Sequence, residues 1–268
     1  MIRTDLAFES AREWEGELKG VKISVEDKGA FKIERVEITE QEAALKLEKP
    51  CGNYVTLSLP TLSLLSDADN EAAKILSDEL KRIIPFDAKS FFVVGLGNRE
   101  ITLDSIGPKS ANKILATRHI GKELRKSLNL TSLRDVSAIA TGVLGKTGIE
   151  TEETISGISD RIKPDCIIVI DSFAAADKGR ICKSVQISNS GINPGSGVGN
   201  CRKEISQRTM KRPVIAIGVP TVSDLGEGII ITHRDIDVCT DKAASIISNA
   251  LNLLMQPSLD LETIIGLI

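Results

Sequence analysis

Two aspartates, Asp104 and Asp171, have the residue type and the positions that could carry catalysis. Asp171 directly follows the apolar, strand-like run 166–170, where burial would disfavour the ionised carboxylate and raise its pKa. Asp104 lies in the loop after the glycine-rich stretch 95–98. Two carboxylates meeting at neighbouring strand ends can share a proton and activate water for attack on a peptide carbonyl. Each also has a purely structural interpretation: Asp104 could cap a helix beginning near Pro108, and Asp171 could accept hydrogen bonds from a loop.

Glycine-rich segments at strand ends are the second candidate feature. In the segment 193–200, closely spaced glycines can turn backbone N–H groups toward one point and stabilise an oxyanion, with about 3 to 4 kcal/mol per well-placed donor. The stretch 95–98 follows an apolar strand in the same way, and a tight turn there needs glycine. The candidates for an oxyanion or substrate loop are Gly95, Gly97, Asn98, Gly195, Gly197 and Gly199.

Two nucleotide-binding interpretations compete with the carboxylate pair. The stretch 140–147 matches a phosphate-binding loop except that Ala140 replaces the first glycine, and a nucleotide hydrolase is the alternative enzyme class. Gly148 follows its Lys-Thr pair where a helix should start, which weakens the match. The stretch 95–98 begins like a dinucleotide-binding turn, but Glu100 stands where the third glycine belongs.

The composition excludes several function classes. The chain has 268 residues, 41% apolar and 26% charged, with 34 basic and 37 acidic residues and a net charge of −3, which argues against a dedicated nucleic-acid binder. Its apolar runs are only as long as strands, which argues against a membrane-spanning protein. The N-terminal residues contain no apolar signal core, which argues against export. Two histidines are few for a zinc hydrolase or a Ser-His-Asp triad. The five scattered cysteines predict reduced thiols in a cytosolic, disulfide-free protein.

The residue pattern predicts an α/β fold with a mostly parallel central sheet flanked by helices and a small antiparallel sheet near the N-terminus. Alternating runs within 21–59 are typical of half-exposed antiparallel strands, and continuous apolar runs at 91–96, 166–170 and 214–219 are typical of buried parallel ones. Helices are expected over 67–83 (capped by Asp67), 108–127, 151–161 (with Thr151 as N-cap) and 238–254, the last closing the chain. We expect a single domain, 1–268, with 21–59 as the flanking sheet and 67–256 as the α/β core.

An ordered series of motifs resembles the germination protease family of spore-forming bacteria, endopeptidases that degrade small acid-soluble spore proteins. The resemblance covers most of the chain up to about residue 224. The stretch 140–147, which partly matches a phosphate-binding loop, falls inside this protease pattern. Its motifs are Arg3 to Ala7, Val93 to Asn98, Thr102 to Pro108, Thr117 to His119, Gly148 to Thr151, Lys163 to Asp171, Gln186 to Ser188, Pro194 to Glu204 and Pro213 to Thr221.

The resemblance implies an atypical acid protease whose catalytic aspartates are Asp104 and Asp171. It implies a phosphorylase/hydrolase-like core, distantly similar to hydrogenase maturation endopeptidases, which use a metal held by acids and a histidine. Asn193 stands where germination proteases usually have histidine. We therefore expect no metal and no other cofactor. His119 belongs to one motif, as either a catalytic or a structural residue.

The resemblance also implies a zymogen that cuts itself between Asp5 and Leu6, a homotetramer, and a location in the cytoplasm of the forespore or spore core. The expected partners are small acid-soluble spore proteins as substrates, with no direct nucleic acid and no membrane. Only Met1 and Ile2 precede the motif, fewer than in relatives, so constitutive activity is an alternative. The non-enzymatic alternative is an inactive member that binds spore proteins through the basic stretch 201–212.

Overall fold

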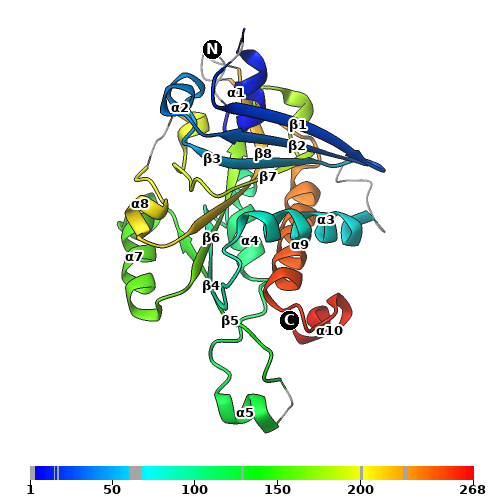
Figure 1. Cartoon of the computed structure of the whole chain (residues 1–268), viewed down its shortest axis with the longest axis vertical. Helices are drawn as coiled ribbons and strands as arrows, with labels where there is room; N and C mark the ends of the chain where they lie inside the picture. Colours follow the sequence, from blue (N-terminus) through cyan, green and yellow to red (C-terminus); the bar gives the residue numbers. More distant parts are fainter. Residues whose placement is uncertain are drawn as a thin grey trace.

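A computed structural model describes residues 4–14, 16, 18–60, 68–127, 130–199, 202–225 and 229–268. Strands and helices alternate from β4 onward, as expected for an α/β fold (Figure 1). The strands are β1 (Val21–Lys28), β2 (Phe31–Ile38), β3 (Gly52–Ser58), β4 (Ser90–Leu96), β5 (Asp135–Gly142), β6 (Cys166–Ala174), β7 (Ser184–Ser188), β8 (Val214–Asp224) and β9 (Ile230–Thr232). The α-helices are α1 (Ala7–Glu13), α2 (Gln41–Leu47), α3 (Ala68–Ile83), α4 (Ile106–Ala111), α5 (Lys122–Ser127), α6 (Leu144–Thr147), α7 (Thr151–Ile162), α8 (Gln207–Met210), α9 (Ile236–Met255) and α10 (Leu261–Leu267). The described residues also contain the 3₁₀ turns η2 (Thr102–Asp104), η3 (Lys178–Arg180) and η4 (Ser196–Val198).

All the strands belong to one sheet with the order β1-β2-β3-β7-β8-β6-β4-β5, and β9 pairs with the end of β8. The strands β8, β6, β4 and β5 are parallel, and the β1-β2-β3-β7 part is antiparallel. The predicted antiparallel strands near the N-terminus are therefore present, but they extend the central sheet through the β3–β7 pairing rather than forming a separate one. The fold class predicted from the sequence is confirmed.

Apolar side chains of the central strands point alternately to two helical layers. Phe91, Val93 and Ile168 pack on one face with α3 and α9, and Phe92 and Val169 pack on the other face with α7 and α8. Figure 1 shows α3, α4 and α9 on one side of the sheet and α7 and α8 on the other. A smaller cluster joins α1 and α2 to β2 and β3 at the antiparallel end. Burial on both faces explains why β4, β6 and β8 are almost continuously apolar.

Several predicted helix boundaries differ from the structure. The helix expected over 108–127 is wrong: α4 ends at Ala111 and α5 begins at Lys122, with a nonhelical connection between them. A further helix, α10, follows the one expected to close the chain. The N-cap of α7 is Glu150 rather than Thr151, and the predicted cap Asp67 lies outside the described residues.

The structure also describes the helices and cysteines on which the cellular location was predicted. Within the described ranges, no helix is both long and apolar enough to cross a membrane. Four of the cysteines, Cys51, Cys166, Cys182 and Cys239, are free thiols, and Cys201 lies outside the described residues.

Candidate active site

Asp171 lies in β6 at the centre of the sheet, where its side chain is 6% exposed. Burial raises the pKa of Asp171 well above its ordinary value, and the negative charge of Asp104 raises it further. The backbone N–H of Ser172 donates to its Oδ1 at 2.9 Å and partly opposes this shift. Asp171 therefore holds its proton to a higher pH than an exposed carboxyl group.

Asp104 ends the 3₁₀ turn η2, which contacts β6. Burial raises its pKa, and a hydrogen bond from the Asn98 N–H to its Oδ2, at 2.8 Å, lowers it in part. Gly97 fits closely beneath this loop: its φ is +105°, and an added Cβ would lie 2.2 Å from the carbonyl oxygen of Asp104. The sequence Gly97-Asn98 thus fixes the position of the Asp104 carboxyl group. Asp104 does not cap α4, whose N-cap is Ser105.

A glycine contact brings the two aspartates to the same edge of the sheet. Gly95 in β4 pairs with Ile170 in β6, so Asp171, the next residue of β6, is level with the end of β4, where the chain continues toward Asp104. A Cβ on Gly95 would lie 2.1 Å from the carbonyl oxygen of Gly107. One on Gly107 would lie 2.2 Å from the Leu96 carbonyl oxygen. The first turn of α4 therefore rests directly on the strand ends, which requires glycine on both sides of the contact.

A row of polar side chains continues the face of Asp171 across the sheet. In register, Asp171 of β6 lies beside Gly218 of β8, and Gly218 lies beside Gln186 of β7. Registered neighbours project to the same face, so Asp171 and Gln186 share one surface. Gly218 leaves room on it for the ring of Phe173, which an added Cβ would meet at 2.2 Å. The sequence shows this face only as the alternation 184–188, where Ser184, Gln186 and Ser188 are all buried.

The N-terminal segment lies over this polar face. The Asp5 N–H donates to the carbonyl oxygen of Ala174 at 2.9 Å, and the Ala174 N–H donates to Asp5 Oδ2 at 2.9 Å. Gln186 bridges the next peptide: its Nε2 donates to the Asp5 carbonyl at 3.0 Å, and its Oε1 accepts from the Ala7 N–H at 2.8 Å. Leu6 is fully buried against Phe173. The predicted processing pair, Asp5 and Leu6, is thus held on the face that carries Asp171.

The glycine-rich segment 195–199 closes around the Asp5 side chain. Ser196 Oγ donates to Asp5 Oδ1 at 2.8 Å, and a Cβ on Gly197 would lie 2.1 Å from Oδ2. Gly195 and Gly199 have φ values of +76° and +71° and form the two ends of the short turn η4. The observed contact of this loop is therefore with Asp5, and the oxyanion role of Gly195, Gly197 and Gly199 stays a prediction.

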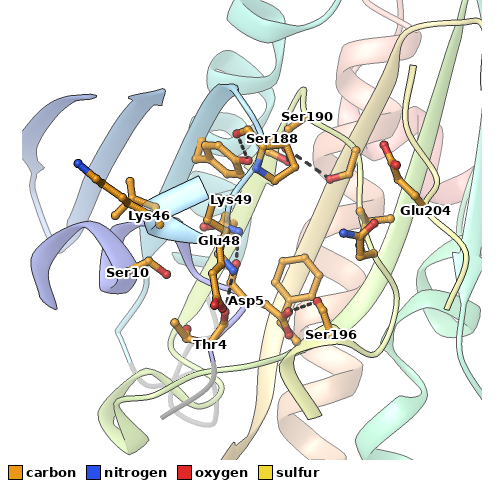
Figure 2. Close-up of a pocket in the computed structure, with 18 of the residues that line it drawn as sticks. Thr4, Asp5, Ser10, Lys46, Glu48, Lys49, Ser188, Ser190, Ser196 and Glu204 are labelled. Carbon is orange, nitrogen blue, oxygen red and sulfur yellow. Dashed lines mark hydrogen bonds between the residues drawn. The ribbon is translucent and has the colours of Figure 1, made fainter. Parts of the chain in front are cut away.

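A cavity of about 480 Å³ opens beside Asp5 (Figure 2). Its lining mixes apolar side chains with polar ones, among them Ser188, Asn193 and Glu204. Lys49 lies at its edge and donates from Nζ to the carbonyl oxygen of Thr4 at 2.8 Å. The sequence analysis assigns no individual role to Lys49, Gln186 or Ser196, and the contacts of Lys49 and Ser196 with the N-terminal residues are visible only in the structure.

Other predicted candidates lie elsewhere or are already paired. His119 is exposed in a turn after α4, and the described residues hold no cluster of three or more His, Cys, Asp or Glu side chains suited to a metal ion. Lys146 of the stretch 140–147 pairs with Glu100. In the basic stretch, Lys203 pairs with Glu153, Arg208 with Glu204, and Arg212 donates to the Pro164 carbonyl.

The sequence comparisons with known proteins identify one family. The family model described as germination protease matches residues 3–226. Among curated relatives, the germination protease of Clostridium acetobutylicum is 35% identical over 320 aligned positions, covering 98% of each chain. That of Caldanaerobacter subterraneus is 43% identical and covers 88% of this chain and 72% of the relative. A solved NiFe hydrogenase maturation protease from Thermococcus kodakarensis is 17% identical with a TM-score of 0.40, covering 66% of this chain and 98% of that one.

The α/β fold is that of an enzyme-type domain, and the family match defines its class as a peptidase. The chain belongs to the germination protease family, and it is a protease of spore germination. The family predicted from the motifs is confirmed.

Proposed function

We propose that this protein is an endopeptidase that degrades small acid-soluble spore proteins through the carboxyl pair Asp104 and Asp171. The observation that carries the proposal is the placement of Asp171, inside β6 and level with the end of β4, next to the loop after β4 that carries Asp104, with the pKa of each carboxyl group raised by burial. Because Asp104 also raises the pKa of Asp171, the pair favours a state with one shared proton.

The proposed reaction uses that shared proton. Asp104 is the less buried of the two, and in its ionised form it takes a proton from a water molecule. The water oxygen bonds to the carbon of the substrate peptide, while the protonated Asp171 donates toward the carbonyl oxygen. Collapse of the tetrahedral intermediate breaks the C–N bond, and the leaving nitrogen receives the proton held by Asp104. One water is consumed, and the products are a carboxylic acid and an amine.

We propose that the reaction needs no metal and no other cofactor. The donor set at this edge of the sheet supplies two carboxylates, and Asn193 stands where a histidine ligand is expected in relatives. An amide side chain is a poor ligand for the transition metals that imidazole binds. A chelator such as EDTA should leave the rate of cleavage unchanged, and restoration of a lost rate by Zn²⁺ would contradict this proposal.

We further propose that the chain is a zymogen cut between Asp5 and Leu6, and that it works as a homotetramer in the cytoplasm of the forespore or spore core. The support for processing is that Asp5 and Leu6 are held on the polar face of the sheet, the face that also carries Asp171. Mass spectrometry of the purified protein over time would show a new N-terminus at Leu6.

The proposed substrate class is tested directly by cleavage. The purified full chain is incubated with small acid-soluble spore proteins, and the fragments are mapped by mass spectrometry. We expect a few discrete cuts between an acidic and an apolar residue. Binding of the spore proteins without any fragments would instead support the inactive, binding-only alternative.

A further inference from the structure

We propose that the site filled by the Asp5 carboxylate is the subsite that selects an acidic side chain in protein substrates, and that Ser196 is the side chain that recognises it. The inference rests on the proposed function, because it assigns a specificity-determining residue to that cleavage. The N-terminal segment occupies this subsite in the structure, and a substrate would take its place after the segment is cut or displaced.

The donors at this site fit a carboxylate. One carboxylate oxygen of Asp5 accepts from the Ala174 backbone N–H at 2.9 Å, and the other accepts from Ser196 Oγ at 2.8 Å. A carboxylate offers only acceptors, so both donors are satisfied. An amide side chain can also reach both groups, with its oxygen accepting from the Ala174 N–H and its NH₂ donating to Ser196 Oγ, but only as a neutral partner. The carboxylate instead makes charge-assisted hydrogen bonds with both donors, which are roughly twice as strong as neutral ones, and this difference selects the acidic side chain.

The shape of the site sets its size. Gly197 closes the pocket against Asp5 Oδ2, where a Cβ would stand 2.1 Å away. A Cβ on Gly197 would also lie 2.9 Å from the Cβ of Ala174. Any side chain at position 197 would therefore fill the space that the carboxylate takes, which explains the glycine there.

The neighbouring contacts are of a kind that a substrate could reproduce. Gln186 binds the Asp5 carbonyl and the Ala7 N–H, and the Ala174 carbonyl accepts from the Asp5 N–H. These bonds involve only the main chain of the bound segment, so they align any extended peptide without reading its sequence. The side-chain selection falls on two positions: the acidic residue at Ser196 and the apolar residue that replaces Leu6 against Phe173.

The site has a route of approach. The cavity of about 480 Å³ borders Asp5 and Ser196, two of the lining residues drawn in Figure 2. The dashed bond between Asp5 and Ser196 in that view lies at the cavity wall. A substrate segment entering through this cavity reaches the carboxylate site without opening the sheet.

The test compares two peptides with four forms of the full chain. One peptide copies residues 4–12, and the other differs only by Asp5→Asn. The chains are the wild type, Ser196→Ala, Ser196→Thr, which retains a hydroxyl group, and Ser172→Ala. The last is a matched control, because the buried Ser172 hydroxyl on β6 has no hydrogen-bond partner among the described residues.

We expect wild type to cleave the acidic peptide at least tenfold faster, by kcat/KM, than the amide peptide. Ser196→Ala should reduce that ratio at least fivefold, while Ser196→Thr and Ser172→Ala should keep it.

The outcomes separate the subsite from the proposed function. Cleavage by wild type with an unchanged ratio in Ser196→Ala overturns the subsite and leaves the protease function standing. If no chain cleaves either peptide even after its own N-terminal segment has been cut before Leu6, the proposed function fails, and a binding measurement then tests the subsite. In that case, fluorescence anisotropy with the full-length Asp5→Ala variant should show at least fivefold tighter binding of the acidic peptide, a preference lost when Ser196→Ala is added. Equal binding of the two peptides would overturn the inference.

Discussion

The negative charge of Asp104 helps to keep a proton on Asp171. Burial is the larger cause of the raised pKa of Asp171, and Asp104 is the next. Asp171 lies in β6 and Asp104 in the loop after β4, and the glycines at 95, 97 and 107 allow that loop and the start of α4 to pack closely on the strands. The chemistry of the site thus depends on close backbone packing at positions that carry no side chain.

The raised pKa of Asp171 predicts how stability varies with pH. Below the ordinary aspartate pKa of about 4, both the folded and unfolded chains are protonated at this residue and no penalty exists. As the pH rises toward the higher folded pKa, the unfolded chain loses the proton first, and the folded state loses about 1.4 kcal/mol of stability for each pH unit. Asp171→Asn removes this penalty, so its free energy of unfolding should exceed that of wild type at pH 7 and approach it near pH 3.

Asp165 gives a control of opposite sign in the same urea-unfolding series. Burial alone would raise its pKa, but hydrogen bonds from Lys89 and Ser90, at 2.8 to 2.9 Å, lower it. Its stabilising contribution is present above the ordinary aspartate pKa and is lost as the pH falls. Asp165→Asn should therefore lower stability at pH 7 and lose that effect in acid. If the change in unfolding free energy varied with pH in the same direction for Asp171→Asn and Asp165→Asn, the opposite pKa shifts of the two residues would be contradicted.

Gly97→Ala should damage both stability and activity. The added Cβ meets the Asp104 carbonyl oxygen at 2.2 Å, and the φ of +105° disfavours any side chain. We expect a loss of at least about 2 kcal/mol of unfolding free energy and a slower reaction, since Asp104 must move. Gly157→Ala in α7 is the matched control, because nothing lies within 4 Å of its added Cβ. It should gain about 0.5 to 1 kcal/mol. Equal effects of the two changes would refute the packing argument.

A buried ion-pair network anchors the N-terminal segment. Arg180 donates to both oxygens of Glu34, at 2.6 and 3.0 Å, and its guanidinium lies 5.2 Å from the ring centre of Phe8 in α1. Arg180→Ala leaves the Glu34 carboxylate buried without this partner, so it should cost about 3 to 5 kcal/mol in thermal or urea unfolding. Lys22→Ala breaks the exposed pair with Glu37 and should cost no more than about 1 kcal/mol. A small loss for Arg180→Ala would show that the network does not contribute to stability.

Gln186→Ala should loosen the segment over the polar face. It removes the donor to the Asp5 carbonyl and the acceptor of the Ala7 N–H. Hydrogen exchange at Ala7 should accelerate at least about tenfold, the equivalent of one hydrogen bond's net free energy. Exchange in the middle of β8, measured in the same sample, should remain unchanged. Unaltered exchange at Ala7 would show that Gln186 does not hold the segment.

The sequence predicts the central strands well because burial on both faces leaves a continuous apolar signal in β4, β6 and β8. The helix expected over 108–127 fails for a tertiary reason. Asn252 on α9 accepts from the Leu115 N–H and donates to the Lys113 carbonyl, so these backbone groups are satisfied without a helix. Such long-range bonds leave no local pattern.

The candidate site was predictable only in part. The acid after an apolar run identifies Asp171, and the glycine turn marks the loop of Asp104. The association of Asp5 with Ser196 joins residues 191 positions apart, and no spacing in the sequence indicates it. The polar alternation at 184–188 is the one local signal that could have pointed to Gln186.

The most direct test of the carboxyl pair is the rate at which Asp104→Asn and Asp171→Asn cleave a small acid-soluble spore protein, compared with wild type at equal concentration and with folding checked by circular dichroism. The amide variants keep nearly the same shape but cannot exchange the proton, so each should lose at least about a hundredfold in rate. A folded variant that still cleaves at close to the wild-type rate would contradict the proposed mechanism.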